Sequence, residues 1–155
     1  MTANGSAIPA AIDALVDSLT TLLPDVLVID GMPVTDASVP KALCVGMRAI
    51  DPTGPDEAAV SNQQWANLGR NTRDETLSIH MLAAGWDGGG NQKLARDAAF
   101  DIVNALADLI QTDPKLGGSV LVVTGVSDLN LSQCQYADGA VAYIPLDLTA
   151  RARLS

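Results

Sequence analysis

Aromatic side chains are scarce in this sequence, and their absence limits how its core can be built. Two Trp, two Tyr and one Phe make up 3% of the 155 residues, whereas hydrophobic residues of all kinds make up 48%. The core must therefore consist of Ala, Val, Leu and Ile, which bury less area per residue than aromatic rings. We expect a single domain over residues 1–155, with packing that is completed in part by an oligomeric interface.

Positive charge is also scarce. Nine Lys and Arg stand against 18 Asp and Glu, giving a formal net charge of -9. Surfaces that bind nucleic acids or anionic membranes need clustered basic residues, and here only Arg151 and Arg153 lie close together near the C-terminus.

The first apolar segment lacks a basic leader and contains Asp13 and Asp17, so we expect neither a signal peptide nor a membrane span. Synthesis in the cytoplasm is the resulting expectation.

Motifs for catalysis or metal binding are equally thin. Cys44 and Cys134 have no metal-ligand spacing, and cysteines in strands are most often buried small hydrophobic residues. A disulfide between the two is the alternative. His80 is the only histidine, and its place on the polar side of a strand predicts a solvated or interface residue. The glycine-rich residues 85–90 match neither a dinucleotide motif nor a P-loop and predict a flexible turn. We therefore expect a protein that is not an enzyme, with no catalytic residue, no cofactor and no metal.

Two segments show helical periodicity. Apolar residues recur at helical spacing over residues 7–23, with Ser6 as a possible cap and Pro24 at the end. A second amphipathic stripe covers residues 92–112 and ends at Asp113-Pro. The aspartates of this second segment, at positions 97, 101 and 108, are read as its solvated face rather than as paired catalytic carboxylates.

Strands are expected in the remaining segments. A short buried strand is predicted at 26–29, a second at 42–49, and a long hairpin at 57–83. A strand over 120–136 loses its alternation twice, which indicates bends or bulges, and a regular strand runs over 142–153. The order helix, strands, helix, strands predicts an α+β fold, a mostly antiparallel sheet with two helices packed on one face.

The first arm of the long hairpin, residues 57–68, is mostly polar, with Trp65 as its one large side chain, and is predicted to be an edge or an exposed arm. A single large aromatic residue in such a segment more often packs into another surface than stays in solvent. Two possibilities stay open, because Trp65 could insert into the core of its own subunit or into a groove on a neighbour.

The overall order of segments has a counterpart in a known family. IPAAIDALVDSL is followed by VLVIDGMPVTD and LCVGM, then by ETLSIHMLAAGWDG, ARDAAFDIVNALADLI, DPKLGG and a final TARARL. Each piece is unspecific by itself, but their succession across nearly the whole chain resembles the tail terminators, or tail-completion proteins, of long-tailed actinobacterial bacteriophages (siphophages).

The resemblance implies an α+β subunit of a homo-oligomer, a hexameric ring that caps the finished tail tube and stops its polymerisation. Such a ring sits in the virion at the head–tail junction, between the major tail tube protein and a head-neck connector or stopper protein. DNA only passes through its lumen, and surplus carboxylates provide a surface that phosphates avoid. The family has no catalytic residues to transfer.

Candidate contacts of the ring must come from the sequence itself. They lie in the polar hairpin, in the glycine-rich turn and in the turn over residues 113–118, and they are Trp65, Asn67, Arg70, Trp86, Asp87 and Lys115.

Two alternatives remain beside the terminator. Another head–tail connector, such as a neck stopper or adaptor, has similar size and composition. A small cytosolic enzyme or ligand-binding domain would centre on His80, Asp87 and the glycine-rich turn.

Overall fold

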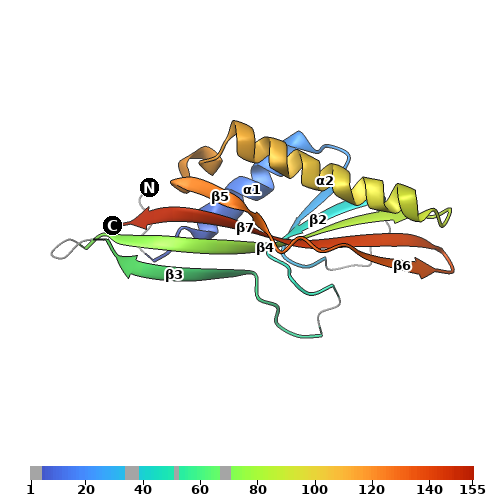
Figure 1. The fold of residues 1–155 in the computed structure, drawn as a ribbon, viewed down its shortest axis with the longest axis horizontal. Coiled ribbons are helices and arrows are strands. Elements are labelled where there is room, and N and C mark those ends of the chain that lie inside the picture. Colours follow the sequence, from blue (N-terminus) through green and yellow to red (C-terminus); the bar gives the residue numbers. More distant parts are fainter. Residues whose placement is uncertain (1–4, 34–38, 51–52, 67–70) are drawn as a thin grey trace.

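A computed structural model describes residues 5–33, 39–50, 53–66 and 71–155, which form two α-helices and a seven-stranded sheet (Figure 1). The helices are α1 (Ile8–Leu22) and α2 (Gln92–Thr112), and a short 3₁₀ turn, η1 (Leu116–Gly118), follows α2. The strands are β1 (Leu27–Asp30), β2 (Lys41–Val45), β3 (Ala59–Trp65), β4 (Arg73–Asp87), β5 (Val122–Ser127), β6 (Ser132–Tyr136) and β7 (Gly139–Leu154). The predicted α+β class, with a mostly antiparallel sheet, is confirmed.

Two long antiparallel strands form the centre of the sheet. β4 and β7 pair along the 15 residues of β4, from Arg73 opposite Leu154 to Asp87 opposite Ala140. On its edge away from β7, β4 pairs with β3 along its first half and with β2 along its second half. On its edge away from β4, β7 pairs with β6 along its first half and with β5 along its second half. β1 lies parallel to β2. The sheet is therefore long and narrow, with different short strands flanking its two ends (Figure 1).

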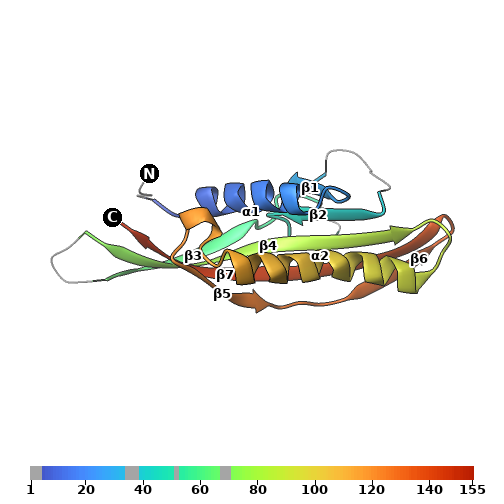
Figure 2. The same cartoon turned by 90° about the horizontal axis from the view of Figure 1, so that it is seen from above.

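Both helices cover the same face of this sheet, as predicted (Figures 1 and 2). The apolar stripe of α1 and that of α2 join the inward residues of β4 and β7 in one core. In β7 the predicted alternation holds, since Ala142, Ile144, Leu146 and Leu148 are buried. We call this side the helix face and the opposite side the open face.

Small residues let α2 approach the sheet closely. A Cβ atom on Gly85 of β4 would lie 2.0 Å from the carbonyl oxygen of Ala95 and 2.8 Å from the nitrogen of Ala99. Because no real Cβ comes this near to backbone atoms, only glycine fits there. The expectation of a flexible turn from residue 85 was wrong at its start, since β4 continues to Asp87 and the turn begins after it.

Two strand predictions need correction. β2 ends at Val45 because Gly46 has φ +87°, and Met47 then joins Cys44 and Leu82 on the open face rather than Val45 in the main core. The single strand expected over 120–136 is two strands, β5 and β6, while the predicted bulge appears between Val123 and Gly125.

Glu75 connects the beginning of α1 to the sheet. Its side chain lies in phase with the apolar residues of β4 and is 1% exposed. The carboxylate accepts hydrogen bonds from the Ser6 hydroxyl (2.5 Å), the Ala7 amide (2.7 Å) and the Ser61 hydroxyl (2.5 Å). Ser6 in turn accepts a bond from the Ile8 amide. The N-cap residue of α1 is Ala7, which makes no side-chain capping bond, so Ser6 belongs to this network instead of being the predicted cap.

Candidate functional site

The open face of the sheet carries a second, smaller apolar cluster. Cys44, Met47 and Leu82 are buried there, and Ile29 and Tyr143 pack against them. Ile29, Cys44, Leu82 and Tyr143 alternate in their strands with residues of the main core, so these strands are apolar on both sides, and Met47 joins the cluster from the segment after β2. Its outer surface forms a groove.

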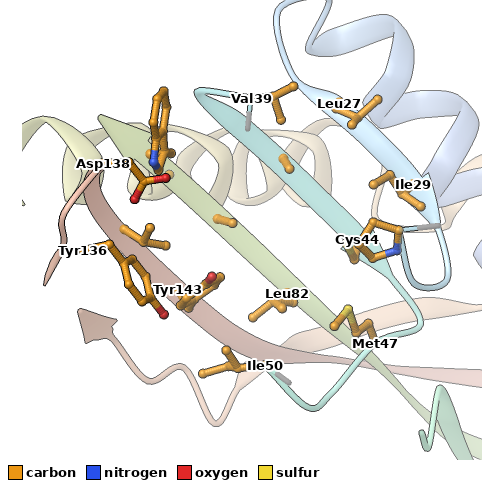
Figure 3. Close-up of a pocket in the computed structure, with 16 residues that line it drawn as sticks. Leu27, Ile29, Val39, Cys44, Met47, Ile50, Leu82, Tyr136, Asp138 and Tyr143 are labelled. Atoms are coloured by element: carbon orange, nitrogen blue, oxygen red, sulfur yellow. The ribbon is translucent and has the colours of Figure 1, made fainter. Parts of the chain in front are cut away.

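The groove has a volume of about 480 Å³ and lies over β1, β2, β4 and β7, with β6 at one side (Figure 3). Most of its lining is apolar or aromatic. The side chains in view include Leu27, Ile29, Val39, Cys44, Met47, Ile50, Leu82, Tyr136 and Tyr143. Leu27 and Ile50 at the rim are 41% and 39% exposed. The volume falls within the range of sites that receive a small molecule or a few side chains. We call this feature the open-face groove.

Trp86 and Asp138 complete one end of the groove. A Cβ on Gly88 or Gly139 would lie 2.8 Å from the Trp86 ring, so these two glycines leave the space that the ring occupies. The predicted interface residue Trp86 is therefore half-buried, and it fixes the turn at this end as well as bordering the groove.

Asp87 organises the turn that leads into α2. Its carboxylate accepts a hydrogen bond from the Asn91 amide (2.8 Å), and its carbonyl oxygen accepts one from Gly90 (3.1 Å). Asn91 then caps α2 by accepting a bond from the Lys93 amide. These contacts give Asp87 a structural role in the turn.

Trp65 is the last residue of β3 and is 68% exposed, more than any other large apolar side chain among the described residues. The possibility that it anchors the core of its own subunit is therefore wrong. In β3 it has the same phase as Ser61 and Gln63, whose side chains reach Glu75, so Trp65 belongs to the helix face.

The other predicted contacts that the structure describes do not gather around Trp65. Asn67 and Arg70 lie outside the described residues. Lys115 is exposed at the start of η1. Trp65 pairs with Arg73 of β4, and Trp86 lies 13 residues further along that strand, roughly 40 Å away at about 3.3 Å per residue. The predicted residues that the structure describes therefore do not form one site.

His80 differs most from its expected environment. It is 4% exposed, and its ring nitrogens contact two carboxylates, Nδ1 with Asp147 at 2.5 Å and Nε2 with Glu57 at 2.8 Å. Arg48 also pairs with Glu57, at 3.2 Å. The expectation of a solvated or interface histidine was wrong, because the register of β4 and β7 places Asp147 directly opposite His80.

The His80 contacts favour a charged imidazolium. Burial of the ring lowers the pKa of His80, but the hydrogen bonds to Asp147 and Glu57 outweigh this effect and raise the pKa above its ordinary value. With both nitrogens held by carboxylates, His80 links β4, β7 and the segment before β3.

This arrangement predicts a pH-dependent contribution to stability. A raised folded-state pKa gives His80 a stabilising effect that is complete below its unfolded pKa of about 6.5 and is lost as pH rises through the folded value. We expect the difference in unfolding free energy between the wild type and His80→Gln to shrink as pH rises above about 6.5. Urea denaturation at several pH values measures it, and a difference that is constant or grows with pH would contradict the assignment.

The remaining sequence expectations concern cysteines, metals and membranes. Cys44 is buried, Cys134 is half-buried, and both are free thiols. Within the described ranges, no group of three or more His, Cys, Asp or Glu is arranged to hold a metal ion. Neither helix is long and apolar enough to span a membrane, as judged over the described part of the chain.

Comparison with known proteins identifies no relative, since neither a protein-family model nor a curated protein matches the chain.

Sequence reasoning missed the groove because no motif marks it. The pattern that could have indicated the groove is a strand with apolar residues on both sides. Cys44 and Leu82 are apolar although their neighbours in the strand already face the core. Tyr136 and Tyr143 belong to different strands that become neighbours only in the fold.

Proposed function

We propose that this chain is a structural virion subunit that caps the tail tube of a long-tailed bacteriophage and ends its polymerisation. The segments behind the resemblance support this proposal because they correspond to α1, β1, β2, β4, α2, η1 and the end of β7. They belong to one continuous sheet with its helices, so the order of segments in the sequence reflects a single folding unit.

The observation that carries the proposal is apolar surface left for a neighbour. The open-face groove exposes aliphatic and aromatic side chains, and Trp65 stands exposed at the far end of the sheet. Exposed apolar surface of this kind is typical of protein interfaces. A subunit of a homo-oligomeric ring, hexameric in the family it resembles, would cover such surface in the assembled virion.

The charge of the chain agrees with a ring that DNA crosses. Acidic residues outnumber basic ones two to one, and the aspartates at positions 97, 101 and 108 lie exposed on α2. Carboxylate-rich surfaces repel phosphates, so DNA would pass through the lumen without being held. The proposed partners are the major tail tube protein on one side and a head-neck connector or stopper protein on the other. No cofactor takes part.

The other candidate functions gain less from the structure. His80 and Asp87, the proposed centre of an enzyme, both have structural contacts. The open-face groove favours a ligand-binding domain, because three aromatic residues, Trp86, Tyr136 and Tyr143, line it. A neck stopper or adaptor would have the same general chemistry, and its place in the virion distinguishes it.

Electron microscopy of particles made without this protein tests the proposal. We expect DNA-filled heads and tails that fail to join, because the ring would form the joint between them. Normally joined virions in the absence of the protein would overturn the proposal.

A further inference from the structure

Trp65 and the open-face groove lie at opposite ends of the same long sheet. Trp65 is opposite Arg73 in the β3–β4 ladder, whereas the groove lies beside residues 82–86 of β4. At about 3.3 Å per residue, the nearest part of the groove is roughly 30 Å from Trp65 along the strand. Trp65 therefore cannot fill the groove of its own subunit.

The two features also face in opposite directions. Trp65 belongs to the helix face, at the end of β3 furthest from β6 (Figure 1). The groove opens on the open face, where Cys44, Leu82 and Tyr143 alternate with core residues. If the open face of one subunit packs on the helix face of the next, the groove of the first subunit meets Trp65 of the second. Two subunits in the same orientation can thus make the contact, without the turn by 180° that a two-fold dimer needs.

The chemistry of the two surfaces is complementary. Tyr136 and Tyr143 in the groove offer ring edges and faces to an indole, and Leu27 and Ile50 at the rim offer aliphatic surface. Arg73, the ladder partner of Trp65, belongs to the helix face as well, and its guanidinium bonds to Gln63 at 2.8 Å. The groove carries an exposed carboxylate, Asp138, at one end. In such a contact, Arg73 beside the inserted Trp65 would therefore lie near Asp138 at the end of the neighbour's groove.

We propose that Trp65 of one subunit inserts into the open-face groove of the next, with a second copy of this chain as the occupant. The contact is heterologous, because each subunit contributes Trp65 to one neighbour and its groove to the other. Repetition of such a contact closes into a ring when the rotation between subunits allows it. The inference rests on the proposed ring-forming function and specifies the side chains that hold the ring together.

Two variants block the two sides of this contact separately. Trp65→Ala removes the inserted side chain but keeps the groove, and Ile50→Lys places a charge on the groove rim but keeps Trp65. Both side chains are exposed in the subunit, so circular dichroism should show a normal fold for both. Sedimentation velocity over a range of concentrations should show roughly 30-fold weaker self-association for each, the effect of losing an interface hot spot. Leu94→Ala and Leu94→Lys on α2 are the matched controls, because Leu94 is 55% exposed and does not line the groove, and both should assemble as the wild type does.

A mixture of the two blocked variants gives the decisive result. One intact contact remains possible, between Trp65 of the Ile50→Lys subunit and the groove of the Trp65→Ala subunit. At a concentration where the wild type assembles but each variant alone is mostly monomeric, we therefore expect the mixture to form heterodimers that grow no larger. Wild-type-like assembly of Trp65→Ala, a mixture that stays monomeric, or a wild-type chain that remains monomeric at every concentration would each overturn the proposal. An effect of these variants on self-association would still stand if particles made without the protein turned out normal, so the two proposals can fail separately.

Discussion

Replacement of Gly85 by alanine is expected to destabilise the protein by roughly 3 kcal/mol or more, at the upper end of the cost of overpacking. The added Cβ would lie 2.0 Å from the Ala95 carbonyl oxygen and 2.8 Å from the Ala99 nitrogen, both part of the α2 backbone. A flexible side chain could move aside, but a helix backbone cannot yield without lifting α2 from the sheet. Denaturant titration followed by circular dichroism measures the loss.

Gly125→Ala provides the matched control for this change. Gly125 also lies in a strand, β5, but its added Cβ would have no atom within 4 Å. We expect a change within about 0.5 kcal/mol, as for other substitutions away from packed features. Equal effects of the two substitutions would show that close packing of α2 on β4 is not what requires glycine at position 85.

Replacement of Glu75 by alanine is expected to cost about 3 kcal/mol, because it leaves several donors without an acceptor. The Ala7 amide and the hydroxyls of Ser6 and Ser61 all donate to this buried carboxylate. Together they hold the first turn of α1 against β3 and β4. Asp74→Ala, next in sequence, is the control, since Asp74 pairs with Arg153 near the surface and should contribute less than about 1 kcal/mol.

The Glu75 effect should also depend on pH. Burial of the carboxyl raises the pKa of Glu75. The hydrogen bonds that the carboxyl accepts from Ser6, Ser61 and Ala7 lower the pKa by more than burial raises it, so the net pKa is below the ordinary value. Its stabilising effect is therefore present above the unfolded pKa of about 4.5 and is lost as pH falls through the folded value. A wild-type advantage over Glu75→Ala that persists unchanged in acid would contradict the network.

Local patterns in the sequence were sufficient for much of the fold. The bounds of α2 were predicted correctly because an uninterrupted apolar stripe ends at Asp113-Pro, and the alternation of β7 identified its buried side chains. Both features arise from residues close in sequence, so no knowledge of distant partners was needed.

The errors arose where a residue's environment depends on distant segments. The local sequence predicts a solvated or interface His80 because its partners, Glu57 and Asp147, lie 23 and 67 residues away. It predicts a flexible turn at Gly85 because the Ala95 backbone that requires glycine there belongs to another element. The candidate site follows the same rule, since Trp86 was recognised from composition while the groove beside it required the registers of β2, β4, β6 and β7.

The length distribution of tail tubes in particles made without this protein tests the central proposal most directly. A protein that caps the tube and ends its polymerisation is required for uniform length, so we expect tubes of widely varying length. Supplying the wild-type protein should restore both a narrow distribution and the joining of tails to heads. Unjoined tails of uniform, normal length would contradict the proposed capping role and would instead favour a connector that acts on the neck.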